Sequence, residues 1–153
     1  MKNEEICPYT VVINTSCDSS KFIRDQISIS FGDAYGNQIF APRLANPNPF
    51  EATFEQCSTN TFQINGSCAY QICYAYLKAS GPDDWKPENV TINGPTTNST
   101  SFNFSTIIPK DQWYGFNLCD DHHDDSSSHQ VYTHTMFLYV LLLLGLLPIC
   151  FWW

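Results

Sequence analysis

The sequence predicts an all-β fold, an antiparallel β-sandwich of about eight short strands braced by disulfides. Seven or eight stretches place apolar residues at every second position, a pattern typical of strands that bury one face. The gaps between the stretches are rich in Gly, Pro, Asn and Asp, which favour turns. The third observation is the cysteine content, seven in 153 residues, which is typical of a small domain of the secretory pathway.

The alternating stretches follow one another along most of the chain. Their apolar members, in chain order, are Tyr9, Val11 and Ile13; Ile27, Ile29 and Phe31; Phe62 and Ile64; Ile72, Tyr74 and Tyr76; Val90 and Ile92; Phe102 and Phe104; and Tyr114, Phe116 and Leu118. Turn pairs such as Gly32-Asp33 and Asn65-Gly66 separate them. Because no stretch before residue 130 has a helical period, we expect the strands to pack as two facing sheets.

Composition divides the chain into four segments. We expect an N-terminal stub over residues 1–6, the sandwich over 7–119, a polar linker over 120–135 and a hydrophobic segment over 136–153. The whole chain has a formal net charge of −8, but six basic and nine acidic side chains leave the sandwich segment at only −3. This acidic balance argues against a nucleic-acid partner, which requires a basic face.

The hydrophobic segment predicts association with a membrane. As a helix, its eighteen uncharged residues would span about 27 Å, close to the roughly 30 Å of a bilayer's hydrocarbon core. One interpretation is a retained transmembrane anchor. The favoured one is a glycolipid-attachment signal, in which residues 129–135 are the spacer and Ser126, Ser127 and Ser128 are the small residues at the attachment site.

The N-terminal stub conflicts with that interpretation. Residues 1–6 contain no apolar core of the kind that an export signal requires. We therefore expect that an export signal is missing from this chain. On that basis the sequence predicts a protein of the secretory pathway, located outside the cell or at the plasma-membrane surface.

The cysteines predict disulfides rather than a metal site. Six lie in the sandwich segment, and Cys150 lies in the hydrophobic segment. No histidine lies among the six and their spacing forms no zinc-type cluster, so disulfides are favoured over zinc. Six cysteines allow fifteen pairings, and the sequence does not select one. The six are Cys7, Cys17, Cys57, Cys68, Cys73 and Cys119.

Five Asn-x-Ser/Thr sequons predict N-glycosylation, and chance alone would give about two. In the predicted strand register, Asn14, Asn65 and Asn103 point away from the core, where a glycan can be accommodated. The five acceptors are Asn14, Asn65, Asn89, Asn98 and Asn103.

The sequence predicts no enzyme. All four histidines follow Cys119, so no Ser-His-Asp or Cys-His arrangement can form within the sandwich segment. Phosphate-binding and nucleophile-elbow motifs are also missing from the sequence. The run Asp-Asp-His-His-Asp-Asp at 120–125 resembles a metal site, but a solvated spacer is the favoured interpretation.

Two acidic loops are the candidate contact and calcium sites. Asp33 and Asn37 lie in one, and Asp83, Asp84 and Glu88 lie in or beside the other. Their oxygens could bind calcium if the two loops meet, although a solvated surface is favoured. Trp85 either caps the core, which is favoured, or is an exposed contact for lipid or a partner. No other cofactor is expected.

Four stretches in order resemble the plant embryo-specific protein family, which is similar to the PLAT/LH2 β-sandwich of lipoxygenases and polycystins. They are CPYTVVINTSC, RDQISISFGDAYGNQIFAPRL, FEQCSTNTFQINGSCAYQICYAYLKASGPDDWKPENVTI and WYGFNLC. The resemblance covers residues 7–119 and all six cysteines. It implies a secreted, non-enzymatic domain of seeds and other plant tissues. Asp84 departs from the glycine expected before the Trp-x-Pro-Glu stretch.

The predicted function is therefore a binding module of the secretory pathway or cell surface. Its PLAT/LH2-like domain would mediate association with membranes, lipids or protein partners through loops at one end, residues 32–37 and 81–87. The alternative is a seed-associated structural or storage-type glycoprotein without a specific ligand.

Overall fold

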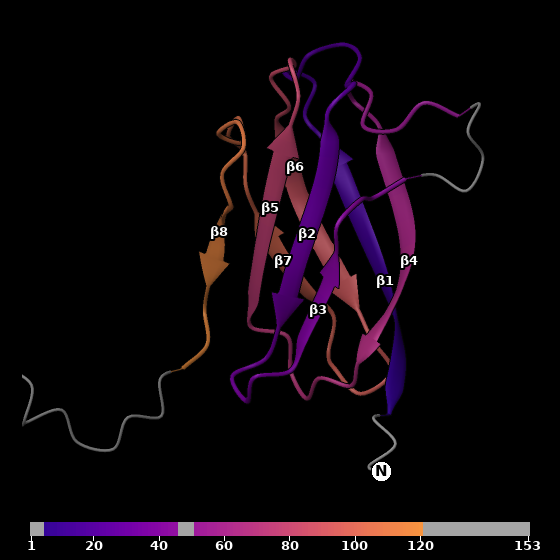
Figure 1. Cartoon of the computed structure of the whole chain (residues 1–153), viewed down its shortest axis with the longest axis vertical. Helices are drawn as coiled ribbons and strands as arrows, with labels where there is room; N and C mark the ends of the chain where they lie inside the picture. The colour runs from indigo at the N-terminus through magenta and orange to yellow at the C-terminus, as the bar shows by residue number, and fades with distance from the viewer. Residues whose placement is uncertain (1–4, 46–50, 121–153) are drawn as a thin grey trace, which may run out of the picture. The chain divides into compact units, whose positions relative to one another are not determined.

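The computed structural model describes residues 5–45 and 51–120, and it confirms the all-β sandwich (Figure 1). Its eight strands are β1 (Ile6–Thr15), β2 (Gln26–Gly32), β3 (Gln38–Ala41), β4 (Thr59–Ser67), β5 (Tyr74–Ser80), β6 (Pro87–Asn93), β7 (Thr100–Asn103) and β8 (Tyr114–Asn117). The predicted hydrophobic helix over 136–153 lies outside the described residues. Within the described residues no helix is long and apolar enough to cross a membrane.

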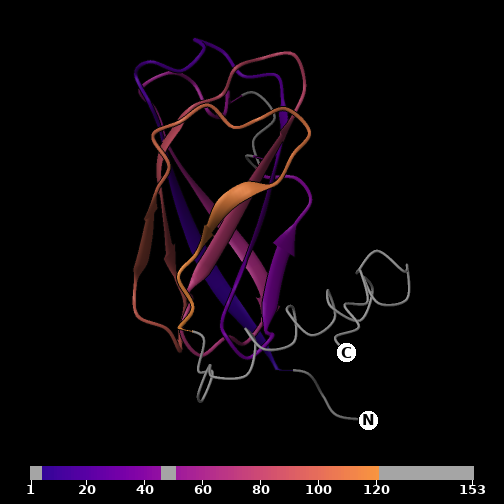
Figure 2. The same ribbon diagram turned by 90° about the vertical axis from the view of Figure 1, so that its left-hand side faces the viewer.

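The strands form two four-stranded sheets, and all strand pairs are antiparallel. The first sheet has the order β4-β1-β6-β7 and the second has the order β3-β2-β5-β8. The sheets face each other, as Figure 2 shows from the side. Every sheet therefore has an inner face that lines the core and an outer face that is directed away from it.

Alternate residues along the strands of the first sheet lie in the core, as the sequence predicted. Tyr9, Val11 and Ile13 of β1 are fully buried. Val11, for example, is opposite Phe62 on one side and Ile92 on the other. This alignment of apolar residues across three strands produces a continuous inner face.

The prediction for β5 was wrong in its choice of face. Tyr74 and Tyr76 point outward, whereas the alternating set Ala75, Leu77 and Ala79 is buried. In the neighbouring β2 the buried partners opposite these three are Phe31, Ile29 and Ile27. Two small alanines thus face two large side chains, and tyrosines in their place would overfill the core.

Two further elements differ from the prediction. The short strand β3, with Ile39 buried and Phe40 exposed, was not among the predicted stretches. Ile72 precedes β5 and is buried outside any strand, and Leu118 follows β8 and is exposed. Strand β3 has only four residues, and Ile72 and Leu118 lie beyond the ends of strands, so the alternation at these places is too short to indicate a face.

The structure resolves the cysteine pairing. Cys7 is bonded to Cys68, Cys17 to Cys57, and Cys73 to Cys119. The first two disulfides join the two ends of the β1–β4 pair. The third joins the residue before β5 to a residue just after β8. Each disulfide therefore fixes an edge strand to its neighbour.

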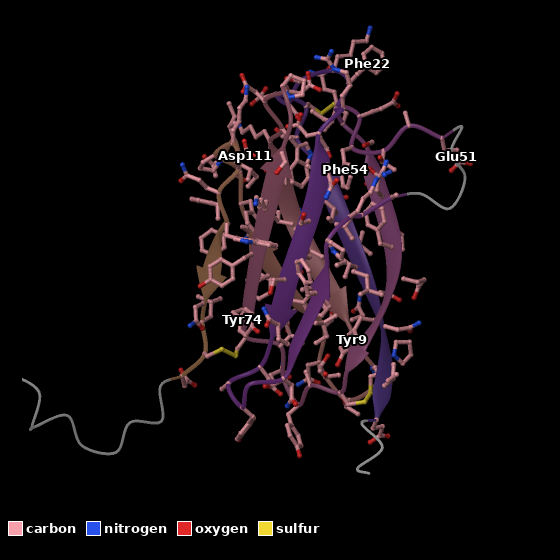
Figure 3. The ribbon with its side chains drawn as sticks, in the orientation of Figure 1. Tyr9, Phe22, Glu51, Phe54, Tyr74 and Asp111 are labelled. Carbon is pink, nitrogen blue, oxygen red and sulfur yellow. A yellow bond between two sulfur atoms is a disulfide. The ribbon has the colours of Figure 1, made fainter. Side chains whose placement is uncertain are left out.

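We refer to the two ends of the sandwich as upper and lower, as they are oriented in Figure 1. The upper end contains the β1–β2 and β5–β6 connections and the Cys17–Cys57 disulfide. The lower end contains the β2–β3, β4–β5 and β6–β7 connections and the other two disulfides. Figure 3 shows Phe22 at the upper end and Tyr74 toward the lower end.

Candidate functional site

The two predicted contact loops lie at opposite ends of the sandwich. In the β2–β5 pair, Gly32 is opposite Tyr74, whereas Gln26 is opposite Ser80. The loop after β2 therefore lies at the lower end, and the loop after β5 lies at the upper end. The two loops cannot share one calcium ion or form one contact surface, which corrects the prediction that both lie at one end of the sandwich.

At the lower end, Asp33 organises its own loop. Its carboxylate accepts hydrogen bonds from the backbone N–H groups of Tyr35 (2.9 Å), Asn37 (3.0 Å) and Tyr70 (2.9 Å) and from Nδ2 of Asn37 (2.8 Å). Burial by itself would raise the pKa of Asp33, but these bonds outweigh burial and lower the pKa below 3.8. Both carboxylate oxygens are thus occupied in holding the β2–β3 loop against the β4–β5 loop.

At the upper end, Asp83 is paired with Arg24. The guanidinium donates to both carboxylate oxygens, at 2.6 Å and 3.1 Å, and the backbone N–H of Arg24 adds a third bond at 2.7 Å. The side-chain hydrogen bonds between them raise the pKa of Arg24 and lower the pKa of Asp83. Nearby, Oδ1 of Asp25 accepts from the backbone N–H of Asp83. Oδ2 of Asp25 is buried without a partner in the described part of the chain.

The other two predicted carboxylates also have protein partners. Asp84 lies 3.5 Å from Nζ of Lys110, and Glu88 accepts a hydrogen bond from the Ser105 hydroxyl at 3.2 Å. Within residues 5–45 and 51–120, no three His, Cys, Asp or Glu side chains come together in a way that could hold a metal ion. The arrangement of the upper end is a set of separate pairs rather than a converging ligand set.

Trp85 is a core residue, as the favoured interpretation predicted. Its side chain is completely buried, its ring packs edge-on against Phe54 at 5.1 Å, and its Nε1–H donates to the hydroxyl of Thr15 at 3.2 Å. The alternative role as an exposed lipid contact is therefore excluded for this side chain.

The sequence reasoning missed the exposed aromatic residues, which are the surfaces most suited to binding. At the lower end the rings of Tyr35 and Tyr70 pack edge-to-face at 5.3 Å, although both residues are largely exposed. Phe40 and Trp113 make a similar contact at 6.0 Å on the outer face of the second sheet. Aromatic residues in turns, such as Tyr35 beside Gly36, were a signal that could have indicated the first pair.

All five sequons lie on the first sheet or in its β6–β7 connection. Asn65, Asn98 and Asn103 are exposed, and Asn14 is half-buried on the outer face, where its Nδ2 donates to Oδ1 of Asn89 at 2.9 Å. The predicted outward orientation of Asn14, Asn65 and Asn103 is confirmed. Glycosylation itself stays a prediction. The proposed lipid-attachment residues, Ser126, Ser127 and Ser128, lie outside the described residues.

Two solved structures illustrate the fold. The coral 8R-lipoxygenase, described as activated by calcium through a C2-like domain, gives a TM-score of 0.59 at 18% identity, covering 88% of this chain and 21% of that one. The alpha toxin from Clostridium absonum also gives 0.59, at 17% identity, covering 75% of this chain and 32% of its own. These likenesses concern the fold alone, and the predicted PLAT/LH2-like sandwich is confirmed.

Sequence comparison identifies the family. The chain is 54% identical to the embryo-specific protein ATS3B of Arabidopsis thaliana over 120 residues, which is 78% of this chain and 62% of that protein. It is 45% identical to ATS3A of the same plant over 133 residues, 87% of this chain and 73% of that protein. The family model described as embryo-specific protein 3 (ATS3) matches residues 1–119, so the chain belongs to this family.

Proposed function

We propose that this protein is a non-enzymatic binding module of the secretory pathway, and that it lies against a membrane surface through the lower end of its sandwich. The observation that carries the proposal is the pair Tyr35 and Tyr70, which are 75% and 69% exposed in spite of their mutual ring contact. Tyrosine is enriched where membrane and water meet, because its ring is apolar and its hydroxyl remains hydrated.

The course of the chain supports this orientation. The Cys73–Cys119 disulfide fixes the end of the sandwich domain at the lower end. The polar residues 120–135 and the apolar residues 136–153 follow Cys119 in the sequence. A membrane-directed segment that follows this point would bring the tyrosine pair, rather than Phe22 of the upper end, toward the lipid surface.

The charge of the lower end favours a particular lipid. The loops at 33–37, 68–73 and 94–99 contain no Lys or Arg, so they lack the basic cluster that attracts anionic lipids. We therefore propose an interface with zwitterionic lipid that depends on aromatic side chains. A calcium bridge is not part of the proposal, because the carboxylate of Asp33 is fully engaged by N–H groups.

The compartment and the absence of catalysis are proposed on separate grounds. Three disulfides are typical of an oxidising environment. All six domain cysteines are consumed by these bonds, and the sequence between Cys7 and Cys119 has no histidine to act as a general base.

Flotation with phosphatidylcholine vesicles tests the membrane proposal. Residues 1–120 form a compact unit that includes the buried core and the three disulfides, so this fragment can be studied without the apolar tail. We expect the fragment to float with vesicles equally with and without calcium. The Tyr35→Ser/Tyr70→Ser variant should lose most of this binding, and the Phe22→Ser variant, changed at the upper end, should retain it.

The other outcomes are decisive as well. Equal flotation of the double tyrosine variant, or loss of flotation in Phe22→Ser alone, would contradict the proposed orientation. If the fragment does not float with vesicles of any lipid composition, the alternative of a structural or storage-type glycoprotein would be favoured.

A further inference from the structure

We propose that the outer face of the second sheet carries a binding site for a neutral carbohydrate. A surface cavity of about 540 Å³ lies on this face. It is separate from the tyrosine pair of the lower end, so this proposal is independent of membrane binding. The residues that line it are Ser30, Gln38, Phe40, Tyr76 and Trp113.

The strand register produces the shape of the site. Phe40 of β3 is opposite Ser30 of β2, Ser30 is opposite Tyr76 of β5, and Tyr76 is opposite Gly115 of β8. Large and small residues therefore alternate along one row across the whole sheet. The small side chain of Ser30 lies between Phe40 and Tyr76 in this row and lines the cavity, to which we refer as the aromatic trough.

Two aromatic rings border this trough. Phe40 belongs to the edge strand β3, whereas Trp113 directly precedes β8, at the opposite edge of the sheet. Their ring centroids are 6.0 Å apart and their planes are inclined at 61°. The two residues are nevertheless 53% and 45% exposed. Exposed rings of this size on a sheet indicate a surface that a ligand covers.

The polar groups of the site indicate the chemistry of the ligand. Nε2 of Gln38 donates to the Ser30 hydroxyl at 2.6 Å, which orients the amide and leaves its Oε1 as an acceptor. Among residues 5–45 and 51–120, none forms a hydrogen bond with Oε1 of Gln38, the Tyr76 hydroxyl or Nε1–H of Trp113. The site thus offers one acceptor, one hydroxyl and one donor beside two apolar rings.

The lining contains no ionisable acid or base that is charged at neutral pH, and this selects among possible ligands. An anionic headgroup or a phosphate would find no cation within the lining, and a metal ion would find no carboxylate. An acyl chain would cover the three polar groups without replacing their bonds to water, which costs free energy. A sugar ring has C–H faces for the aromatic rings and hydroxyls for the polar groups, so it complements both.

The position of the sequons keeps this face free. The five acceptor asparagines lie on β1, β4, β6, β7 and the β6–β7 connection, all of the first sheet. No sequon in the sequence falls on the strands of the second sheet. Glycans attached at the four acceptors on strands would therefore cover the opposite outer face and leave the aromatic trough open.

Nuclear magnetic resonance on the full-length chain tests the proposal, in micelles of a detergent that has no sugar headgroup. Cellohexaose and mannohexaose are added as neutral probes, hexagalacturonate as the anionic probe and dodecanoate as the acyl probe. We expect at least one neutral hexaose to shift the indole N–H signal of Trp113. The signal of Trp85 should stay in place, because that indole is buried and bonded to Thr15.

Variants separate the ring contact from the hydrogen bonds. Trp113→Ala should weaken binding of that hexaose about tenfold, and Tyr76→Phe, which removes only a hydroxyl, should weaken it about threefold. Phe22→Ala removes an equally exposed ring at the upper end and should leave the affinity unchanged. Hexagalacturonate should bind at least about tenfold more weakly than the neutral probe.

Three results would overturn the proposal. The first is that neither neutral hexaose shifts Trp113 at concentrations up to about 10 mM. The second is that Trp113→Ala binds the hexaose as tightly as the unchanged chain does. The third is that dodecanoate or hexagalacturonate competes for the site with higher affinity than the hexaose, which would assign the trough to an apolar or an anionic ligand.

Discussion

The two ends of the sandwich neutralise their carboxylates in different ways. At the upper end, Asp83 is paired with the guanidinium of Arg24, and Asp84 with the ammonium of Lys110. At the lower end, no cation among residues 5–45 and 51–120 pairs with Asp33, which is held by four N–H groups from three residues. Asp84 is exposed at the surface and Asp83 is held by Arg24, whereas Asp33 is 3% exposed and part of the loop framework.

This difference shows that an acidic loop in a sequence does not by itself indicate a metal site. A carboxylate in a turn often accepts backbone N–H bonds, which stabilises its charge as effectively as a cation does. The two ends should therefore respond differently to mutation, pH and salt, and the following predictions use these responses.

The largest effect is expected at the upper end from Trp85→Ala. Removing this fully buried ring leaves a cavity beside Phe54 and leaves the Thr15 hydroxyl without its indole partner. The free energy of unfolding should fall by about 3–5 kcal/mol. Urea denaturation measures it, and Trp113→Ala is the matched control, with an expected loss of about 0.5 kcal/mol or less. Similar losses in the two variants would contradict the burial of Trp85.

The disulfides give the next comparison between the ends. Cys17–Cys57 at the upper end and Cys73–Cys119 at the lower end have sequence separations of 40 and 46, so either loss should cost about 4 kcal/mol by the chain-entropy estimate. The local consequences should differ. The four-residue strand β8 depends on Cys73–Cys119, whereas β4 remains paired through the nine-residue ladder from Ile6 to Asn14 and through the Cys7–Cys68 disulfide.

Hydrogen exchange of the two double serine variants measures this difference. We expect the amides of β8 to lose protection in Cys73→Ser/Cys119→Ser, while those of β4 remain protected in Cys17→Ser/Cys57→Ser. Equal loss of protection in β4 and β8 would show that the longer ladder and the Cys7–Cys68 disulfide do not hold β4 in place.

At the lower end, Asp33→Asn should reduce stability by about 1–3 kcal/mol, because the amide nitrogen would face N–H donors and leave them unpaired. Urea denaturation at pH 7 measures the loss. Asp18→Asn is the control, since the Asp18 side chain is 79% exposed and bonded only weakly to Lys86. A loss of the same size at Asp18 would contradict the framework role of Asp33.

The contribution of Asp33 to the pH dependence of stability can be isolated at the lower end. The pKa of Asp33 is lowered in the folded protein, so its contribution is fully present above its ordinary pKa of 3.8. This contribution to stability is lost as the pH falls through the pKa that Asp33 has in the folded protein, which is lower still. The stability difference between the unchanged protein and Asp33→Asn should therefore shrink below about pH 4. A difference that is constant from pH 7 to pH 2 would exclude this linkage.

The smallest effect is expected from Arg24→Gln at the upper end, because the guanidinium is 73% exposed. We expect a small decrease in melting temperature at low ionic strength that disappears near 1 M salt, where the screening length is about 3 Å. Thermal melts at both salt concentrations test it, with Asp33→Asn as a variant whose loss should persist in high salt.

Several features could be predicted from local patterns because they depend on neighbouring residues only. The period of two along Tyr9, Val11 and Ile13 indicated a strand and its buried face, and the turn pair Gly32-Asp33 indicated the end of a strand. The predicted turn at Asn65-Gly66 was wrong, because both residues lie within β4 and pair with β1. Trp85 was correctly placed in the core. The even number of domain cysteines correctly indicated disulfides.

The inverted face of β5 shows where local patterns fail. Both sets of alternate residues, the tyrosines and the Ala-Leu-Ala series, have the period of a strand. The neighbouring strand β2 decides which set is buried. Its Ile27, Ile29 and Phe31 already fill the core beside β5 and leave room for small side chains. The exposed trough around Tyr76 is a direct consequence of this choice.

The sequence by itself determined the fold class, the number of disulfides and the family of this protein, because periodicity, cysteine count and motif order are properties of short stretches. Only the tertiary structure decided which cysteines pair, which loops share an end and which aromatic rings meet on one face. The disulfide partners are separated by 40 to 61 residues. Contacts over such distances follow from the order of strands in the two sheets, and no local pattern specifies that order.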